Sequence, residues 1–371
     1  MTIPHSTTHE TDVAIIGAGP VGLFAIFELG MLKIRAHVID TLPAVGGQCS
    51  ALYPEKPIYD IPGFLSIEGQ GLIDNLAAQA APFDPVYHLD QQVTLVEKRD
   101  GGWRVGTNKG TVIDCKAVII AAGCGAFGPN RPPLANIEQF EGTSVHYMVA
   151  KREDFRDQTL VIAGGGDSAV DWANSLAEVA KKIYMVHRRD KFRAMPESVS
   201  KMQALAEAGK IEFVVPYQLE SLAGVEVSDS VAPQLREPLA AGVSEAKGGQ
   251  APLLKKKLTA VGLKSMDGSI REVEADHLLA FFGLSMELGP IANWGLNLHG
   301  NHIATQVGTS ATSAPGIFAI GDIATYPHKL KLILCGFAEA AQAAHAIREI
   351  VYPGVAHHFE YSTSKGVPAA A

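Results

Sequence analysis

The hydrophobic pattern near the start of the chain changes its period twice between residues 11 and 40. Residues 13–16, VAII, form a short apolar run rich in β-branched side chains, which is typical of a buried strand. From Pro20 onward the apolar residues recur at helical spacing, and at 36–39 the run AHVI again has the pattern of a buried strand. The segment is therefore predicted to fold as strand, turn, helix and strand.

Two glycines occupy the predicted turn between this first strand and the helix, and a third lies at the start of the helix. Gly17, Gly19 and Gly22 have the spacing G-x-G-x-x-G. In this motif the first glycine permits the tight turn, the second lets the backbone approach a pyrophosphate, and the third allows helix and strand to pack closely. Asp40 ends the second strand, 18 residues after Gly22, where a carboxylate can accept hydrogen bonds from an adenosine ribose. The segment predicts a dinucleotide site, with an ordinary glycine-rich turn as the alternative.

The same pattern returns 147 residues further along the chain. The run TLVIA is followed by a glycine turn, by apolar residues at helical spacing and by a second strand-like run, IYMV. Gly164, Gly166 and Ala169 stand in the G-x-G-x-x-G/A positions of this repeat. Two such folds in one chain imply two dinucleotides.

The residues that follow the second strand of each fold indicate which nucleotide it binds. The first fold has Asp40, which suits an unphosphorylated ribose, whereas the second has VHRRDKFR with Arg188, Arg189 and Arg193 and no acid in the ribose position. A 2′-phosphate favours guanidinium groups, because they are permanently charged and donate two parallel hydrogen bonds. We therefore expect FAD in the first fold and NADPH in the second, with a solvated basic loop as the alternative for the arginines.

A further glycine–acid pair follows a strand-like run near the C-terminus. Gly321 and Asp322 stand between FAI and a long alanine-rich helical stretch. Asp322 could hold a ribityl hydroxyl of a flavin, while the start of the helix offers backbone N–H groups to the electron-poor end of the ring. The alternative is a plain N-cap aspartate.

These patterns predict an α/β protein with two Rossmann-like three-layer dinucleotide-binding domains, in which the NADPH domain is inserted in the FAD domain. The expected bounds are 1–130 for the first part of the FAD domain, 131–290 for the NADPH-binding domain, and 291–371 for the second part of the FAD domain with a C-terminal tail. Residues 221–257 have few aromatic side chains, and their pattern fits either an enlarged hairpin or a surface excursion.

Composition narrows the function classes. The 371 residues carry a formal net charge of −8, and no basic stretch is dense enough to neutralise a nucleic-acid backbone. No run of 18 apolar residues occurs and the N-terminus has no signal-peptide core, so we expect a cytoplasmic protein that does not enter a membrane. The spacing of the four cysteines is too wide for C-x-x-C or for a zinc knuckle; they are Cys49, Cys115, Cys124 and Cys335. Pro54 stands where the larger disulfide reductases have a second cysteine after GGQC.

Six segments, taken together, indicate a known family. They are GAGPVG, GGQCSALYPEKPIYDIPGF, AAGCGAF, GGGDSAVDW, VHRRDKFR and FAIGDIATYPHKLKLILCGFAEA. They resemble the thioredoxin-reductase-like, or type 2, ferredoxin–NADP+ reductases of bacteria over nearly the whole chain, excepting residues 221–257. Thioredoxin reductases share both folds but carry C-x-x-C in the NADPH domain, whereas the corresponding region here, TSVHYMVAKRE, has no cysteine.

The resemblance implies a homodimer that holds FAD and NADP(H). The flavin contacts that it carries over by position are Asp40, Gln48, Tyr53, Val93, Phe127, Asp322 and Thr363. Tyr53 would stack on one face of the isoalloxazine ring, and Tyr361 of the partner subunit would cover the other face. No side-chain acid or base is needed, because the flavin itself exchanges a hydride at N5 and single electrons with its partners.

The predicted function is therefore electron transfer between NADP(H) and ferredoxin, or flavodoxin, through FAD. Two alternatives remain open from the sequence. The first is an NADPH-dependent flavin reductase whose acceptor is a quinone, a disulfide protein or oxygen. The second is a flavin redox sensor that binds NADPH without useful turnover.

Overall fold

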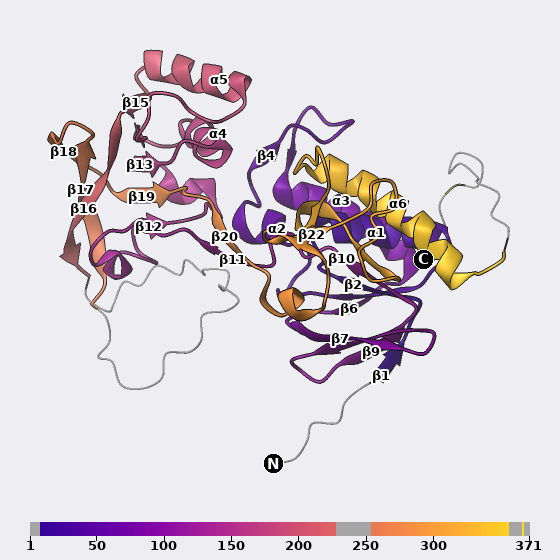
Figure 1. The fold of residues 1–371 in the computed structure, drawn as a ribbon. Coiled ribbons are helices and arrows are strands. Elements are labelled where there is room, and N and C mark those ends of the chain that lie inside the picture. The colour runs from indigo at the N-terminus through magenta and orange to yellow at the C-terminus, as the bar shows by residue number, and fades with distance from the viewer. Residues whose placement is uncertain (1–7, 228–253, 356–365, 367–371) are drawn as a thin grey trace. The chain divides into compact units, whose positions relative to one another are not determined.

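The computed structural model describes residues 8–227, 254–355 and 366, and the chain folds as two compact units (Figure 1). Unit 1 comprises Met1–Ala126 and Met286–Ala371, and unit 2 comprises Phe127–Ser285. The second unit is thus inserted in the first. Its limits lie four and five residues before the expected bounds of 131 and 290.

The central sheet of unit 1 has five parallel strands in the order β23-β10-β2-β3-β6. These are β2 (Val13–Ile16), β3 (Ala36–Ile39), β6 (Val86–His88), β10 (Ala117–Ile120) and β23 (Ile317–Ala319). Every residue of β2 and β10 is buried, as expected for strands that are covered on both faces. The two runs VAII and AHVI therefore form the neighbouring strands that the sequence pattern predicts.

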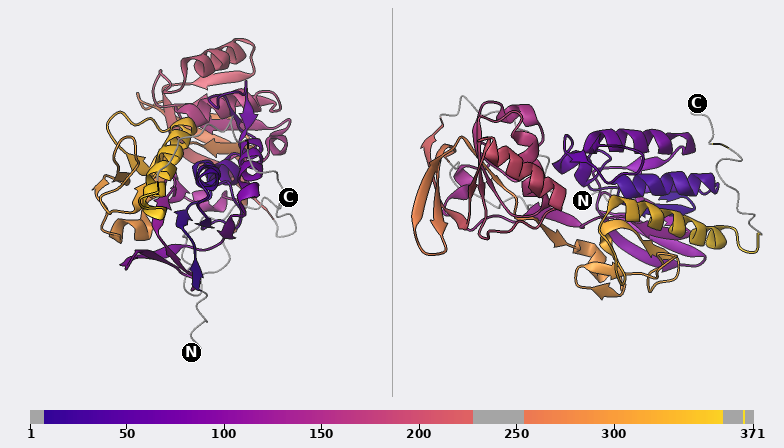
Figure 2. Two further views of the ribbon diagram at one scale, coloured as in Figure 1. Left: turned by 90° about the vertical axis from the view of Figure 1, so that its right-hand side faces the viewer. Right: turned by 90° about the horizontal axis from the view of Figure 1, so that it is seen from above.

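Three helices cover one face of this sheet (Figure 2). They are α1 (Pro20–Met31), α3 (Gly69–Ala80) and α6 (Ile333–Val351). Leu23 of α1 and Ile347 of α6 belong to one buried cluster with Val13 and Ile15 of β2. Alternate residues of each strand thus provide the helix-facing half of the core.

A second sheet covers the opposite face, in the order β1-β9-β8-β7. Its strands are β1 (Thr8–Glu10), β7 (Val93–Arg99), β8 (Gly102–Thr107) and β9 (Val112–Cys115). Ala14 and Ile16, which point away from the helices, pack with Val105 and Ile113 of this sheet. Helices, parallel sheet and second sheet together form the predicted three layers.

The remaining elements of unit 1 are short. They are α2 (Gln48–Leu52), β4 (Pro57–Ile58), β5 (Ile67–Glu68), η1 (Ala81–Phe83), η4 (Gly289–Asn293), β21 (Leu298–His299), β22 (His302–Ala304), η5 (Gly321–Ile323) and β24 (Ala324–Thr325). Two connecting strands, β11 (Ala126–Pro129) and β20 (Leu284–Glu287), pair with each other where the chain passes between the units.

Unit 2 has a five-stranded parallel sheet in the order β12-β19-β13-β14-β15. Its strands are β12 (Val145–His146), β13 (Thr159–Ala163), β14 (Lys182–Val186), β15 (Ile211–Val214) and β19 (His277–Ala280). Helix α4 (Asp167–Leu176) packs on β13, and α5 (Pro196–Glu207) packs on β15 and α4. Short 3₁₀ turns, η2 (Ile137–Gln139) and η3 (Arg152–Phe155), precede the first glycine turn of this unit.

An antiparallel sheet, β16-β17-β18, forms the third layer of unit 2. Its strands are β16 (Tyr217–Glu226), β17 (Lys256–Ser265) and β18 (Ile270–Glu274). Leu258 and Leu263 of this sheet share a buried cluster with Val161 and Leu278 of the parallel sheet. The predicted fold class is therefore confirmed for both units. Both ends of the unassigned 221–257 segment belong to paired strands, while residues 228–253 lie outside the described part of the chain.

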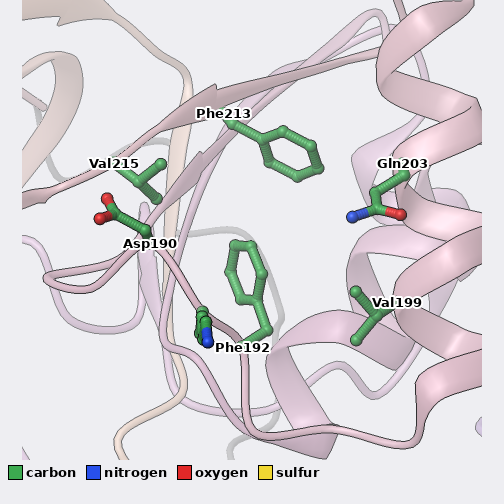
Figure 3. A pocket seen from close by; sticks show the side chains of 7 residues that line it. Asp190, Phe192, Val199, Gln203, Phe213 and Val215 are labelled. Atoms are coloured by element: carbon green, nitrogen blue, oxygen red, sulfur yellow. The ribbon is translucent and has the colours of Figure 1, made fainter.

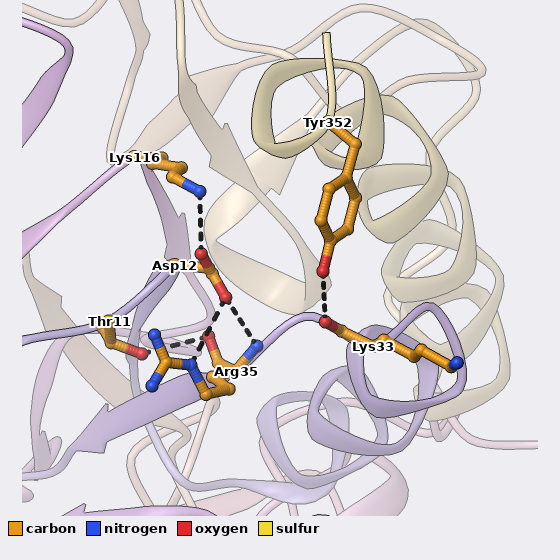
Figure 4. Close-up of polar contacts among 6 residues, drawn as sticks. All are labelled: Thr11, Asp12, Lys33, Arg35, Lys116 and Tyr352. Carbon is orange, nitrogen blue, oxygen red and sulfur yellow. Dashed lines mark hydrogen bonds and ion pairs between the residues drawn. The ribbon is translucent and has the colours of Figure 1, made fainter. Parts of the chain in front are cut away.

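Polar contacts tie the elements of unit 1 together at the edge where β2 and β3 begin (Figure 4). The Asp12 carboxylate accepts the Arg35 backbone N–H at 3.1 Å and the Lys116 ammonium at 3.0 Å. Tyr352, just after α6, donates its hydroxyl to the Lys33 carbonyl at 2.6 Å. Dinucleotides bind at the carboxyl ends of parallel strands, so these contacts at the amino ends serve the fold.

No helix in the described ranges has the length and apolar content needed to span a bilayer.

A histidine pair makes the stability of unit 2 sensitive to acid. His146 Nε2 and His277 Nδ1 are 3.0 Å apart, and the buried Phe155 ring packs edge-on against both rings. Burial lowers the pKa of His146 to about 3 and that of His277 to about 4. Because both values lie below the ordinary histidine pKa of about 6.5, the folded state keeps the pair neutral while the unfolded chain takes up protons.

We expect the free energy of unfolding of unit 2 to be highest above pH 6.5 and to decrease as the pH falls from 6.5 toward 4. Between pH 6.5 and 5 each histidine lowers the free energy of unfolding by at most about 2 kcal/mol. Urea unfolding can be followed by the fluorescence of Trp172, which is 2% exposed in α4, after Trp103 and Trp294 of unit 1 are replaced by Phe. A profile that stays flat from pH 7 to pH 5 would contradict this prediction.

Candidate functional site

The first glycine turn of unit 1 requires glycine at two positions for packing. Gly17 has a φ of +112°, and a Cβ at this position would lie 2.3 Å from the Ala121 carbonyl oxygen. A Cβ at Gly22 would lie 2.0 Å from the Gly17 carbonyl oxygen. These two glycines let the turn, α1 and the end of β10 come together.

Gly19 is different, because its surroundings are open. It has an ordinary φ of −70°, and a Cβ built there would meet no atom within 4 Å. Gly19 is also the N-cap of α1, and no side chain caps that helix, so backbone N–H groups of its first turn remain available. Gly46 donates its N–H to the Ala18 carbonyl at 2.8 Å, which brings the following loop beside the turn. The space and the free donors fit the pyrophosphate of FAD.

Asp40 lies next to this turn, at the carboxyl end of β3. Its carboxylate accepts the backbone N–H groups of Ala18 at 2.6 Å and Leu42 at 2.8 Å. Burial raises the pKa of Asp40, and these backbone hydrogen bonds oppose the rise. The Thr41 backbone also hydrogen-bonds to this carboxylate, which leaves a lone pair that can accept a ribose hydroxyl. The Val93 side chain, by contrast, is buried in the core at 5% exposure, so it contributes no side-chain contact to this site.

Helix α2 brings Gln48 and Tyr53 to the same region. Gly47, with a φ of +56°, begins the helix, and a Cβ there would lie 3.1 Å from the Gly19 Cα. Cys49 donates its thiol to the Tyr53 hydroxyl at 3.6 Å, and the Lys56 ammonium lies 5.9 Å from the centre of the Tyr53 ring. Burial raises the pKa of Tyr53 well above its usual value, so the phenol is neutral.

Asp322 lies close to these groups. It follows β23 within η5, and its charge contributes to the raised pKa of Cys49, Tyr53 and Cys124, for each of which burial is the main cause. The Gln48 side chain hydrogen-bonds to the Cys124 thiol and opposes the rise at that residue. The Asp322 carboxylate accepts no hydrogen bond within the described ranges, so it is available to a ribityl hydroxyl. The structure thus brings together Gln48, Tyr53 and Asp322.

Three of the expected flavin contacts are not described. Phe127 belongs to β11, but its side chain lies outside the part of the chain that the structure describes. Tyr361 and Thr363 fall in 356–365, which also lies outside the described residues. Their predicted roles stay predictions.

The sequence reading missed two side chains beside Asp322. His302 of β22 lies close to Asp322 and Lys331, and burial is the main reason why its pKa is lowered. Its Nε2 atom is buried without a hydrogen-bond partner in the described ranges. His302 lies in a short strand outside the six family segments. Lys331 lies within one of them, FAIGDIATYPHKLKLILCGFAEA, but neither residue has a periodic position that marks it as a site residue. The orphaned ring nitrogen is a further group that a bound flavin could satisfy.

The glycine turn of unit 2 has the same construction. Gly164 needs to be glycine, since a Cβ there would lie 2.6 Å from the Phe281 carbonyl oxygen, whereas a Cβ at Gly166 would meet nothing within 4 Å. Gly166 is the N-cap of α4, which again has no capping side chain, and Ala169 is buried at the third motif position. The second fold therefore has its own open turn, facing free N–H groups.

The arginine loop is held against this turn. The Arg193 backbone N–H donates to the Gly165 carbonyl at 2.6 Å, and the His187 ring lies so close to Gly165 that a Cβ there would be 2.2 Å from its Cε1 atom. The guanidinium groups of Arg188, Arg189 and Arg193 are exposed and form no ion pair within the described ranges. Burial is the main cause of the lowered pKa of His187, and the charges of all three arginines add to the lowering, so they lie near this ring.

The Phe192 ring anchors the loop through its contact with Phe213 (Figure 3). The Phe192 ring lies 5.5 Å from the His187 ring and 5.7 Å from the Phe213 ring, measured between centroids. Beside it is a cavity of about 320 Å³ lined by Asp190, Lys191, Phe192, Val199, Gln203, Phe213 and Val215. The anchored aromatic ring fixes the backbone of the loop and leaves the arginine heads in solvent.

Three of the cysteines, Cys49, Cys115 and Cys124, have the properties of structural residues. All four are free, and burial raises the pKa of Cys49 to about 11 and that of Cys115 to about 12. Burial also raises the pKa of Cys124. A thiol with a raised pKa is a poor nucleophile at neutral pH, because only the thiolate reacts. Within the described ranges no group of three or more His, Cys, Asp or Glu residues could hold a metal ion.

Comparison with known proteins adds independent findings. A family model, the pyridine nucleotide-disulphide oxidoreductases, matches residues 11–349. A ferredoxin–NADP reductase from Paramagnetospirillum magneticum is 55% identical, over 97% of this chain and 98% of its own length. One of the same name from Rhodospirillum rubrum is 53% identical, over 98% of each chain.

Solved structures of lower identity share the fold. A thioredoxin reductase from Lactococcus lactis superposes with a TM-score of 0.72 at 23% identity, covering 92% of this chain and 99% of that one. A thioredoxin reductase from T. acidophilum gives a TM-score of 0.74 at 21% identity, covering 92% and 98%. At these identities the likeness concerns the fold alone.

Proposed function

The chain belongs to the pyridine nucleotide-disulphide oxidoreductase family, and we propose that it is a ferredoxin–NADP+ reductase of the thioredoxin-reductase-like type. It passes electrons between NADP(H) and ferredoxin through FAD. The observation that carries this proposal is the pair of open glycine turns, of which the second is bordered by three arginines that form no ion pair in the described part of the chain. Relatives that are more than half identical over nearly their whole length bear the name of this activity, which supports ferredoxin as the partner.

We assign the following residues to the two cofactors. The FAD residues are Gly17, Gly19, Gly22, Asp40, Gln48, Tyr53, Val93 (through its backbone), Phe127, Asp322 and Thr363. The NADP(H) residues are Gly164, Gly166, Ala169, Arg188, Arg189 and Arg193. Their support is the space at the second glycine of each turn, the accepting capacity that Asp40 and Asp322 keep among the described residues, and three guanidinium groups that form no ion pair there.

The chain's own residues position and shield the cofactors. Bound FAD supplies hydride exchange at N5 and single-electron transfer. Asp40 binds the ribose and Asp322 the ribityl chain, while Tyr53 covers a ring face and excludes water. The neutral Cys49 and Tyr53 surrounding this region have raised pKa values, so they neither donate nor accept protons readily at neutral pH. This environment suits a reaction without side-chain acid–base catalysis.

Four finer points extend this proposal. The protein works as a homodimer in the cytoplasm, and flavodoxin can replace ferredoxin as partner. Tyr361 in the C-terminal tail covers the second flavin face of the partner copy. Helix α6 supports coverage of the partner's flavin. Near its start, Gly336 lies against the Asp322 turn, and the 19 residues of the helix extend about 28 Å at 1.5 Å per residue, so the residues after the helix begin far from the flavin of the same chain.

A coupled assay tests the proposed activity. NADPH-dependent reduction of cytochrome c by the purified yellow protein should require added ferredoxin and should saturate with it. A quinone or oxygen acceptor would instead give NADPH oxidation that ferredoxin does not increase. Binding of FAD and NADPH without ferredoxin-dependent turnover would favour a redox sensor and reject the proposal.

We also expect that no cysteine is required for turnover. A variant with Cys49, Cys115, Cys124 and Cys335 replaced by Ala should, at wild-type circular dichroism, retain ferredoxin-dependent activity within a factor of about three. The reason is that the thiols of Cys49, Cys115 and Cys124 have raised pKa values. The assay compares initial rates at equal flavin content. Loss of turnover in folded Cys49→Ala alone would revive the disulfide-protein alternative.

A further inference from the structure

A buried ion pair lies behind the turn that carries Asp322. Glu339 of α6 is 2% exposed, and its carboxylate receives three hydrogen bonds. Oε2 accepts the Gly321 backbone N–H at 2.8 Å, while Oε1 accepts the Tyr326 hydroxyl at 2.7 Å and the Lys329 ammonium. The Lys329 side chain is only 5% exposed. One carboxylate therefore ties three points of the preceding segment to α6.

The same turn is packed tightly against two helices. Gly321 has a φ of +73°, and a Cβ at Gly336 would lie 3.4 Å from the Gly321 Cα and 2.4 Å from Cγ2 of Val21 in α1. Gly336 is one turn of α6 before Glu339, so the helix contacts the Asp322 turn at both positions. A shift of the Glu339 carboxylate would therefore move the turn that carries Asp322.

We propose that Glu339 and Lys329 are positioning residues for the flavin, which hold the Asp322 turn in place and keep the charge behind it balanced. The proposal rests on the assignment of FAD to unit 1. A buried pair of opposite charges largely cancels at a distance, whereas removal of one partner leaves a charge that a low-dielectric interior screens poorly. Burial is the main cause of the raised pKa of Tyr326, so its hydroxyl stays protonated and adds no charge.

This arrangement predicts opposite effects of the two single substitutions. Because reduction adds negative charge to the flavin, an uncompensated Lys329 cation favours the reduced cofactor and an uncompensated Glu339 carboxylate disfavours it. Glu339→Gln should therefore raise the midpoint potential of bound FAD, and Lys329→Met should lower it. The double variant, which removes both charges, should lie close to the wild type. Loss of packing alone would shift both single variants in the same direction.

The test uses purified holoprotein and measures the midpoint potential of bound FAD by dye equilibration, together with FAD affinity by titration of the apoprotein. We expect Glu339→Gln to bind FAD at least tenfold more weakly and to have a higher potential than Lys329→Met. A tenfold change in the ratio between the affinity for oxidised FAD and the affinity for reduced FAD corresponds to a shift of about 30 mV in the midpoint potential of a two-electron couple. Asp114→Asn, which breaks the half-exposed Arg104–Asp114 ion pair of the same unit, should leave both readouts unchanged.

Equal potentials in the two single variants, or the reverse order, would overturn the proposal. If Glu339→Gln does not fold, Lys329→Met decides alone, and an unchanged potential in that variant rejects the charge balance. Both readouts are independent of ferredoxin. A chain that binds no FAD at all would instead refute the proposed function, so the two failures can be told apart.

Discussion

Gly19→Ala and Gly166→Ala should each give a protein that folds like the wild type but binds its dinucleotide at least 100-fold more weakly. Neither added Cβ meets a protein atom within 4 Å, and the φ values of −70° and −99° are ordinary for alanine. The methyl group occupies the space that we assign to the pyrophosphate. Loss of two charge-assisted hydrogen bonds to backbone N–H groups, at about 1.5–3 kcal/mol each, accounts for a change of this size.

Each substitution has an internal control in the other fold. Gly19→Ala should weaken FAD in titrations of the apoprotein and leave NADP+ binding intact, and Gly166→Ala should do the reverse. Gly22→Ala is the structural counterpart, because its Cβ would lie 2.0 Å from the Gly17 carbonyl oxygen, so its apoprotein should melt at a clearly lower temperature. Wild-type FAD affinity in Gly19→Ala would show that the open space is not the pyrophosphate site.

The elements that build the two turns could be predicted from local pattern alone. In β2 all four residues of VAII are buried, and in β13 four of the five residues of TLVIA are, so the apolar runs identify strands covered on both faces. The glycines between strand and helix have the roles that the motif predicts. Ala121 leaves no space for a side chain at Gly17, whereas the space beside Gly19 is open. Local sequence was sufficient here because the constraint is local.

The flavin surroundings could be predicted only in part, since they depend on contacts between distant segments. Asp322 follows a recognisable strand, but its neighbours His302 and Lys331 come from segments without periodicity. Glu339 did leave a signal. It lies on the buried face of α6, together with Gly336, Ala340 and Ala343. A carboxylate on a buried helix face requires a polar or charged partner. The sequence does not reveal that this partner is Lys329.

Replacing both Arg188 and Arg189 by Ala should abolish the preference for NADPH over NADH. Charge-assisted contacts to a 2′-phosphate contribute about 1.5–3 kcal/mol each, so the ratio of kcat/KM values for the two nucleotides should fall by about 10²–10⁴. The loss should appear with NADPH, whereas values with NADH, which lacks the phosphate, should change little. Arg193→Ala removes a single contact, so it should also reduce kcat/KM with NADPH, by less than the double variant. This requires that the backbone hydrogen bond from residue 193 to Gly165 still holds the loop.

Lys191→Ala is the matched control, since it removes one exposed positive charge from the same loop without removing a guanidinium. If general electrostatic attraction caused the preference, Lys191→Ala and Arg188→Ala would have equal effects, whereas a bidentate phosphate site predicts a loss only for the arginine.

His187 gives a second readout that needs no turnover. The arginines that lie near it add to the lowering of its pKa, so a bound 2′-phosphate should raise that pKa on NADP+ binding, and NAD+ should not. Equal shifts with both nucleotides would place the phosphate elsewhere.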